Sequence, residues 1–279
     1  MGKITSDEFK VIAGYIYNIS GIYLDESKTY LVETRLKHLI KETGSVSYYE
    51  LCHKAKYDPA CGALEGKIID GICTQETLFF RDNSPFELLR TSILPELVAR
   101  KKTQPSFFPT SIRIWSAACS TGQEIYSIAI VLKEFMLNPS KFNIQLLGTD
   151  ISDSAISGAV SGEYSEVAVG RGLPKDKRNK YFFKTGLKWK IRDDIKSICT
   201  FKKYNLMDSF NGLGRFDIVF CRNVAIYFKP KDKVTLFNKF ANILEPGGYL
   251  IIGSSEALSG ISSRFEPVIH SNMICYRLK

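Results

Sequence analysis

Beyond residue 110 the sequence alternates short apolar runs with segments of helical periodicity. The apolar runs are SIRIWSAAC, NIQLLGTD, FDIVFCRN and GGYLIIGSS, and helical patterns such as Glu124–Met136 and Lys231–Leu244 separate them. Continuous apolar strands that alternate with helices form mostly parallel sheets with helices on both faces. After Gly248 no helical pattern follows, and FEPVIHSNMICYRLK predicts one or two antiparallel strands. We therefore expect an α/β fold built on a Rossmann-like, mostly parallel sheet.

The first 100 residues have helical periodicity throughout. The stretch SKTYLVETRLKHLIKETG ends at Gly44, a common stop for a helix. The apolar residues on one face of this helix are Val32, Leu36, Leu39 and Ile40. The basic residues beside that face, spaced three apart, are Arg35, His38 and Lys41.

Two domains are expected from these patterns. A further helix is predicted over Pro85–Arg100, and KKTQPSFFPTS, with two prolines, is typical of a linker. We predict an all-α domain with its linker over residues 1–105 and the α/β domain over residues 106–279.

A basic segment interrupts the alternation inside the second domain. Residues 171–203 carry 12 Lys/Arg and 3 Asp/Glu, which equals the whole +9 net charge of the chain. RGLPKDKRNKYFF predicts a short helix from about Pro174, and LKWKI alternates as an exposed strand does. We expect a small β-subdomain here. Its charge either binds an acidic partner (nucleic acid, an anionic membrane surface or an acidic protein) or is a solvated face.

Composition argues against several classes of protein. No run of about 18 apolar residues is present, and MGKITSDEFK lacks the apolar core of a signal peptide, so a cytoplasmic location is expected. The 7 cysteines are scattered and never form a Cys-x-x-Cys pair, which argues against a disulfide framework or a zinc site. The 3 histidines share no ligand spacing, and we predict no metal.

The first strand of the α/β domain leads into a turn with a single glycine. In IWSAACSTGQEIYSIA the small residues Ser116–Gly122 let the backbone approach a ligand, and Glu124 begins the next helix. A glycine-rich pyrophosphate fingerprint is absent, which favours a ligand without phosphates over a dinucleotide. The second strand ends at Asp150, where a carboxylate either binds ribose hydroxyls or caps the next helix. S-adenosylmethionine is a ligand of this kind, because it has a ribose and no phosphates.

Five motifs, in this order, resemble those of the chemotaxis receptor methyltransferases, the CheR family. They are TQETLFFRD (Thr74–Asp82), IWSAACSTGQEIYSIA, GTDIS, YNLMD and FDIVFCRNVAIYF (Phe216–Phe228). The resemblance covers nearly the whole chain, and the combination is far more specific than any single motif. It implies a class I S-adenosylmethionine-dependent methyltransferase sheet, preceded by a small all-α domain. It also implies a protein-glutamate O-methyltransferase that esterifies glutamates on the cytoplasmic helices of chemoreceptors and releases S-adenosylhomocysteine.

The same resemblance implies which residues contact the cofactor. By position in the motifs they are Gln75, Thr77, Arg81, Glu124, Asp150, Asn205, Leu206, Arg222 and Asn223. Asp150 is expected on the ribose, and Asn205 and Leu206 near the adenine. Gln75 departs from the family, which usually has Asn there, so its longer amide needs a shifted backbone to keep the same hydrogen bond.

The implied reaction needs no general base. A glutamate with a pKa of about 4.3 is already ionised at neutral pH and can attack a sulfonium methyl directly. Rate then comes from orienting the two groups in a pocket that holds little water. Arg81 is the first candidate for positioning a carboxylate because a guanidinium binds that group with two hydrogen bonds. Tyr227, through its hydroxyl, is the second. The plainer alternatives are a surface ion pair for Arg81 and a packing role for Tyr227.

The receptor is the partner that the resemblance implies. Receptor methylation regions are helical and rich in glutamate, so Arg35, His38 and Lys41 are expected to dock along them. The stretch between Phe183 and Thr200 is short for the hairpin that binds a receptor C-terminal peptide in some members. We therefore expect a member that needs no such tether, and a monomer.

Two other functions stay open on the residues alone. A nucleic-acid methyltransferase would suit the basic segment, but the Asn/Asp-Pro-Pro-aromatic motif is missing and Cys221 follows Phe220, not proline. A non-catalytic scaffold that retains the cofactor is favoured only by Gln75, whereas the family's residues at Arg81, Asp150 and Asn223 are intact.

Overall fold

A computed structural model describes residues 3–60, 62–102, 109–136, 142–270 and 273–279. The boundary predicted between residues 105 and 106, and most of the predicted linker, lie in the segment 103–108, outside the described residues.

The N-terminal part of the chain consists of helices that enclose their own core. They are α1 (Ser6–Ser20), the 3₁₀ turn η1 (Glu26–Lys28), α2 (Thr29–Glu42), α3 (Tyr48–Lys56) and α4 (Ala63–Ile72). A capping box formed by Thr5 and Glu8 begins α1, and Gly21, at φ 76°, ends it. The residues predicted to form the apolar face of α2 are all buried in this core: Val32, Leu36, Leu39 and Ile40.

A helical segment then connects this part to the sheet. The predicted helix over Pro85–Arg100 is a continuous run of α5 (Ser84–Leu88), a π-helical turn (Leu89–Ile93) and α6 (Leu94–Lys102). Phe86 and Leu89 of this run are buried together with side chains of the main sheet. The segment is therefore part of the α/β core rather than of the N-terminal helices.

The main sheet has seven strands in the order β6-β2-β1-β7-β8-β10-β9. The strands are β1 (Thr110–Ala117), β2 (Phe142–Asp150), β6 (Cys199–Lys203), β7 (Phe216–Cys221), β8 (Leu244–Ile252), β9 (Phe265–His270) and β10 (Met273–Leu278). The first five pair in parallel, whereas β10 pairs antiparallel with both β8 and β9. The predicted parallel sheet with antiparallel C-terminal strands is confirmed. The strand order reverses between β1 and β7, the place where open α/β sheets bind ligands.

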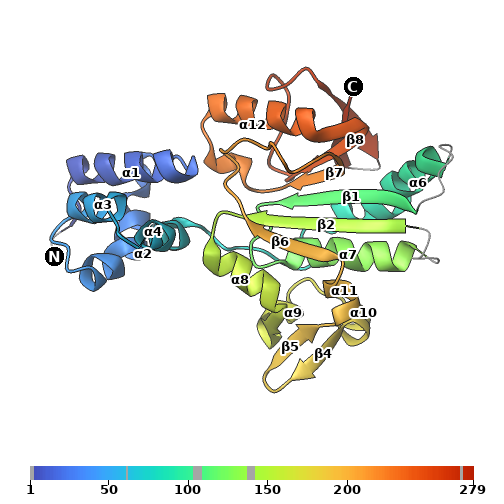
Figure 1. Cartoon of the computed structure of the whole chain (residues 1–279), viewed down its shortest axis with the longest axis horizontal. Coiled ribbons are helices and arrows are strands. Elements are labelled where there is room, and N and C mark those ends of the chain that lie inside the picture. Colours follow the sequence, from blue (N-terminus) through green and yellow to red (C-terminus); the bar gives the residue numbers. More distant parts are fainter. Residues whose placement is uncertain (1–2, 61, 103–108, 137–141, 271–272) are drawn as a thin grey trace.

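Two apolar cores cover the faces of this sheet. Along β1, Ile112 and Ile114 face one core, whereas Trp115 and Ala117 face the other. The helix α7 (Gln123–Phe135) packs in the first core and α12 (Pro230–Ile243) in the second. Figure 1 shows these two helices on opposite sides of the sheet, with the N-terminal helices beyond the carboxyl ends of β1 and β2. Burial on both faces explains why the strands are apolar without alternation.

A second, three-stranded sheet has the order β3-β5-β4. Its strands are β3 (Glu163–Ser165), β4 (Phe182–Thr185) and β5 (Lys188–Ile191). The helices in the same stretch of the chain are α8 (Asp153–Ser161), α9 (Glu166–Gly170), α10 (Lys175–Tyr181) and α11 (Asp193–Lys196). The predicted basic segment 171–203 differs from this unit at both ends. The first strand, β3, precedes residue 171, and β6 at the other end pairs with β2 in the main sheet. The basic residues indicate which part of the unit is exposed to solvent, but they do not indicate which strands pair, so the predicted ends were wrong.

Among the helices described, none combines the length and apolar character needed to cross a bilayer.

Gly148, within β2, is packed so closely that a side chain cannot be added without movement. A Cβ there would lie 2.9 Å from the Phe201 ring and 3.0 Å from Ile125. We expect Gly148→Ala to lower the free energy of unfolding by about 1–3 kcal/mol, measured by urea denaturation. Gly14→Ala is the matched control, because its Cβ would meet nothing within 4 Å on the surface of α1. This control should raise stability by about 0.5–1 kcal/mol, and equal values for the two variants would contradict the packing argument.

Candidate active site

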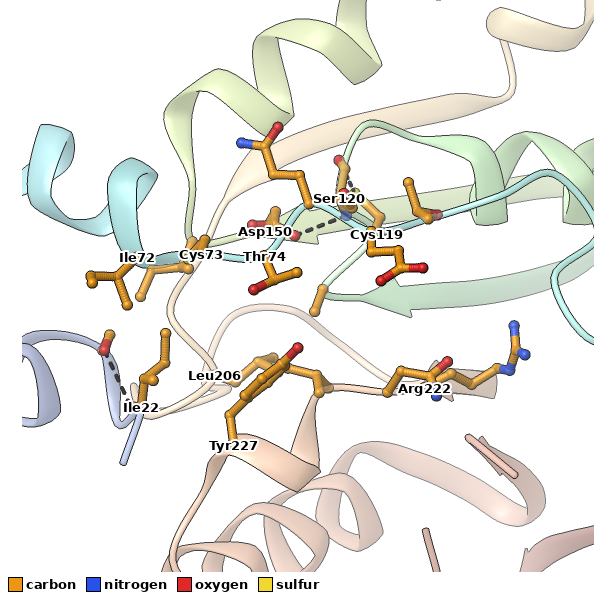
Figure 2. Close-up of a pocket in the computed structure, with 18 of the residues that line it drawn as sticks. Ile22, Ile72, Cys73, Thr74, Cys119, Ser120, Asp150, Leu206, Arg222 and Tyr227 are labelled. Atoms are coloured by element: carbon orange, nitrogen blue, oxygen red, sulfur yellow. Dashed lines mark hydrogen bonds between the residues drawn. The ribbon is translucent and has the colours of Figure 1, made fainter. Parts of the chain in front are cut away.

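One pocket lies at the carboxyl ends of the parallel strands, beside the reversal of strand order. Its lining comes from the segments after β1, β2, β6 and β7, together with residues of the N-terminal helices and the connector, residues 73–83 between α4 and α5. All ten residues predicted for catalysis or cofactor contact line it: Gln75, Thr77, Arg81, Glu124, Asp150, Asn205, Leu206, Arg222, Asn223 and Tyr227. Figure 2 shows Tyr227 and Leu206 facing Asp150, Ser120 and Cys119 across this pocket.

The turn after β1 uses the left-handed backbone region at residues that are not glycine. Ala118 has φ 63° and Ser120 φ 50°, and Gly122 follows at φ 93°. Such conformations are uncommon for side-chain-bearing residues and cluster at functional sites. The Ser120 hydroxyl is buried, and among the described residues it has no hydrogen-bond partner. The turn therefore presents backbone and one unused hydroxyl to the pocket.

Asp150 is a buried carboxylate held by backbone donors. Its Oδ2 accepts a hydrogen bond from the Ser120 N–H at 2.8 Å, and its Oδ1 accepts one from the Ser152 N–H at 3.0 Å. Burial raises the pKa of Asp150 above its ordinary value, although these N–H donors act in the opposite direction. Because a carboxylate can accept about four hydrogen bonds, Asp150 keeps capacity for hydroxyl groups of a ligand.

Arg222, at the end of β7, is the centre of an ion-pair network. Its guanidinium lies 3.0 Å from Glu124 of α7 and 2.6 Å from Asp82 of the connector. It also donates to the Arg81 carbonyl at 2.9 Å. The Arg222 side chain is only 2% exposed, so the two carboxylates compensate a charge that water cannot reach.

Arg81 sits in a strained segment that is anchored on both sides. Phe80 has φ 51° and Asp82 φ 66°. The Phe80 N–H donates to the Ser127 hydroxyl at 2.9 Å, and the Phe79 and Phe80 rings are buried in the core below α7. The Arg81 guanidinium donates to the Glu76 carbonyl at 2.9 Å and lines the pocket.

The side-chain amides of Gln75 and Asn205 form hydrogen bonds with other segments of the protein. Gln75 donates to the Ser154 hydroxyl at 2.8 Å, which joins the connector to the start of α8. Asn205 donates to the Ile19 carbonyl at 2.9 Å and accepts from the Met207 N–H. Asn205 therefore joins the loop after β6 to α1, a link between distant parts of the chain that the sequence did not indicate.

Tyr227 lies on the 3₁₀ turn η4 (Ala225–Tyr227) and is 37% exposed. Its carbonyl accepts a hydrogen bond from the Tyr23 N–H at 2.9 Å. Tyr23 and its neighbours Ile22 and Leu24 form one wall of the pocket, and sequence analysis missed this wall. The signal in the sequence is weak, because GIYL after α1 has no distinctive chemistry.

The predicted docking residues lie outside the pocket and are not equivalent. His38 and Lys41 are exposed on α2. Arg35 is half-buried and donates to the Ile72 carbonyl at 2.8 Å and to the Thr74 hydroxyl at 3.1 Å. Because Ile72 and Thr74 line the pocket, Arg35 supports the wall of the site.

The thiols near the pocket are unsuited to nucleophilic attack. Burial raises the pKa of Cys73 to about 12 and raises the pKa values of Cys119 and Cys221 well above their ordinary range. Since the thiolate is the nucleophile, these residues are unreactive near neutral pH. Within the described ranges, no group of three or more His, Cys, Asp or Glu side chains could hold a metal ion.

Removing the Arg222 charge should destabilise the folded protein, because it breaks the ion-pair network. We expect Arg222→Met to lower the free energy of unfolding by about 3 kcal/mol, because Glu124, itself 12% exposed, is left without a counter-charge. Arg90→Met removes an ion pair with Glu87 in which both side chains are about half exposed, and should cost about 1 kcal/mol or less. Urea denaturation of both variants provides the measurement. Equal losses would show that the Arg222 network does not stabilise the fold.

Comparison with known proteins relates both parts of the chain to one family. The model of the CheR methyltransferase SAM-binding domain matches residues 75–274, and that of the CheR methyltransferase all-alpha domain matches residues 7–63. "Chemotaxis protein methyltransferase Cher2" of Pseudomonas putida is 38% identical over 282 residues, covering 100% of this chain and 99% of its own. "Chemotaxis protein methyltransferase 1" of Pseudomonas aeruginosa is 39% identical, with 98% of each chain covered.

Solved structures add only a distant likeness. The glycopeptide N-methyltransferase MtfA complexed with sinefungin is 16% identical, with a TM-score of 0.34, over 64% of this chain and 54% of its own. Identity to the chemotaxis methyltransferases, by contrast, extends over both parts of the chain. The protein belongs to the CheR methyltransferase family and is a methyltransferase.

Proposed function

We propose that this enzyme transfers a methyl group from S-adenosylmethionine to glutamate side chains on the cytoplasmic helices of chemoreceptors. The products are glutamyl methyl esters and S-adenosylhomocysteine, and the reaction takes place in the cytoplasm. One observation carries the proposal: a single pocket combines a buried acid at the end of the second strand, Asp150, with Arg81 and Tyr227, and its thiols, Cys73 and Cys119, have raised pKa values. The relatives' names, chemotaxis protein methyltransferases, support the same substrate class.

The pocket fits S-adenosylmethionine on the chemistry of its donors and acceptors. Asp150 keeps acceptor capacity for two ribose hydroxyls, and the unpartnered Ser120 hydroxyl adds a polar contact beside it. The half-buried Ile22 and the buried Ile72 offer an apolar surface for the adenine near Leu206. Glu124 and Arg222 supply both signs of charge for the amino acid end of the cofactor.

The protein's part in the reaction is orientation. S-adenosylmethionine, when bound, would supply a methyl group on a sulfonium sulfur. An ionised carboxylate oxygen would form a bond to the methyl carbon as the carbon–sulfur bond breaks, the sulfur would leave as the neutral thioether of S-adenosylhomocysteine, and no proton would be transferred. Arg81 can hold a carboxylate with two hydrogen bonds, and the anchored backbone around it limits the entropy lost on binding. Tyr227, partly exposed on the opposite side, can donate its hydroxyl hydrogen to an acceptor oxygen and exclude water from the reacting atoms.

The two parts of the chain have separate tasks in this proposal. The all-α part, residues 1–105 with its linker, docks on the receptor helices through α2 and also forms a wall of the pocket. The part over 106–279 carries the basic subdomain and forms most of the cofactor pocket, which Gln75, Thr77 and Arg81 complete. The helical run from α5 to α6, although it lies before residue 106, packs in the core of this second part. The hairpin of β4 and β5 has four residues in each strand, which supports a member that needs no receptor peptide tether. We propose that the protein acts as a monomer and does not use nucleic acid.

The test is a base-labile methyl assay. Purified protein is incubated with methyl-labelled S-adenosylmethionine and membranes that contain chemoreceptors. We expect receptor-sized bands whose label is released as methanol by alkali, since a carboxyl methyl ester is hydrolysed by base. Binding of S-adenosylhomocysteine without base-labile label would reject the glutamate substrate and favour another acceptor or a scaffold.

Arg81→Ala is the decisive variant in that assay. We expect it to lose nearly all transfer, because the carboxylate that it positions is no longer oriented, while its thermal unfolding stays close to that of wild type. Arg81→Lys should recover part of the activity, since a lysine keeps the charge but not the paired geometry. Activity of Arg81→Ala within a few-fold of wild type would reject the assignment.

Charge reversals on α2 can distinguish residues that dock on the receptor from a residue that supports the pocket. The double variant His38→Glu and Lys41→Glu should weaken binding to a glutamate-rich receptor fragment by about threefold to tenfold and lower its salt dependence. Its Kd for S-adenosylhomocysteine should be unchanged, because neither residue lines the pocket.

Arg35→Glu should weaken binding of both ligands, since Arg35 also holds Ile72 and Thr74. Calorimetry of the double variant and of Arg35→Glu, each with the receptor fragment and with S-adenosylhomocysteine, gives the four Kd values. Unchanged receptor binding in the double variant would leave His38 and Lys41 as a solvated face.

A further inference from the structure

Glu256 follows β8 and bridges the ends of two neighbouring parallel strands. Its Oε2 accepts a hydrogen bond from the Asn223 N–H at 2.8 Å and another from the Gly253 N–H at 2.7 Å. Asn223 follows β7 and Gly253 follows β8, so one carboxylate oxygen joins both strand ends. The other oxygen, Oε1, is buried and lacks a partner among the described residues. Glu256 is absent from the pocket lining and has no part in the mechanism above.

The bridge supports an unfavourable backbone conformation. Asn223 has φ 58°, in the left-handed region, which asparagine tolerates better than most residues but which still has a conformational cost. A hydrogen bond from a backbone N–H to a charged carboxylate is stronger than one to a neutral acceptor. The Glu256 carboxylate therefore offsets the cost of the turn at Asn223.

Two pocket residues depend on that turn. Arg222 immediately precedes Asn223, and its guanidinium must reach Glu124 and Asp82 within 3.0 Å. Tyr227 follows four residues later, on η4, with its carbonyl bonded to Tyr23. A different backbone direction at Asn223 would move both side chains relative to Asp150.

Gly253 leaves the space that the bridge requires. A Cβ at this position would lie 2.8 Å from Glu256 Oε2 and 2.9 Å from the Asn223 backbone nitrogen. Both distances are shorter than a Cβ contact allows, so a methyl group at 253 must displace the carboxylate or the turn. The same junction can thus be disturbed from two directions, by removing the carboxylate or by filling the space beside it.

We propose that Glu256 is a positioning residue for methyl transfer, which acts through Asn223 on Arg222 and Tyr227 and touches neither substrate nor cofactor. The proposal rests on the proposed function for the placement of these two residues in the cofactor pocket. It adds a residue from the end of β8 to a site otherwise built from the segments after β1, β2, β6 and β7, the connector and the N-terminal helices.

The test compares three variants at the junction with one matched control. Glu256→Ala removes the acceptor, Glu256→Gln keeps an acceptor oxygen, and Gly253→Ala leaves the carboxylate but fills the space beside it. Ser255→Ala is the control, because Ser255 is exposed in the same loop. For each, calorimetry gives the Kd for S-adenosylhomocysteine, steady-state assays give KM for S-adenosylmethionine and kcat, and calorimetric scans give Tm.

We expect Glu256→Ala and Gly253→Ala to raise Kd and KM by about tenfold and to lower kcat, with Glu256→Gln within about threefold of wild type. Ser255→Ala should match wild type. Simple destabilisation would lower the active fraction and Tm without changing Kd or KM, so wild-type Kd and KM in Glu256→Ala would overturn the proposal. Should Glu256→Ala fail to fold, Gly253→Ala decides on the same criterion.

The outcomes also separate this inference from the proposed substrate. If wild type binds S-adenosylhomocysteine but labels no receptor, the glutamate substrate is rejected, while the Kd values still decide the role of Glu256. If wild type does not bind S-adenosylhomocysteine, the cofactor assignment and this inference fail together.

Discussion

The buried charge of Arg222 is the constraint on which the site depends. A guanidinium that is 2% exposed cannot remain without counter-charges, and it finds them on two elements far apart in the sequence, α7 and the connector before α5. Meeting this electrostatic requirement brings the end of β7, the first turn of α7 and the Arg81 segment to one place. The strained backbone at Phe80 and Asp82 persists because buried aromatic rings and the Arg222 bonds hold it there.

The N-terminal helices are part of the site as well as a candidate docking surface. Near the C-terminal end of α1, the Ile19 carbonyl accepts a hydrogen bond from the Asn205 side-chain amide. The loop that follows α1 places Ile22 and Tyr23 in the pocket wall. Tyr17 of α1 donates to Asp232 of α12 at 2.8 Å, and the Lys229 ammonium lies 3.9 Å from the Tyr17 ring centre. These contacts, together with the hydrogen bond from the Tyr23 N–H to the Tyr227 carbonyl, connect α1 to the turn that carries Tyr227. The helices proposed to dock on the receptor are therefore attached directly to the proposed methyl-transfer pocket.

In the proposed reaction, catalysis by orientation accounts for the residues that line the pocket. The proposed acceptor, a glutamate that is already ionised, requires no base, and the pocket thiols of Cys73 and Cys119 have pKa values too high for nucleophilic attack. What the chain supplies instead is a set of groups with fixed positions: Asp150 held by two N–H donors, Arg81 between two left-handed residues, and Tyr227 on a short helical turn. Proximity of this kind accounts for a large share of the rate in many enzymes.

The pattern of the sequence by itself determined the parallel sheet, the helical N-terminal part and the position of Asp150 at a strand end, and the resemblance of its motifs to the CheR family indicated the ten residues around the pocket. Periodicity is a local property, and motif residues at the ends of parallel strands must meet at one edge of the sheet. Only the tertiary structure decided how the polar side chains are used. Arg35 supports the connector at Ile72, Gln75 and Asn205 bind other segments, and Glu256 joins the ends of β7 and β8. The partner of a hydrogen bond is set by which distant segment folds against it, and no local pattern in the sequence records that.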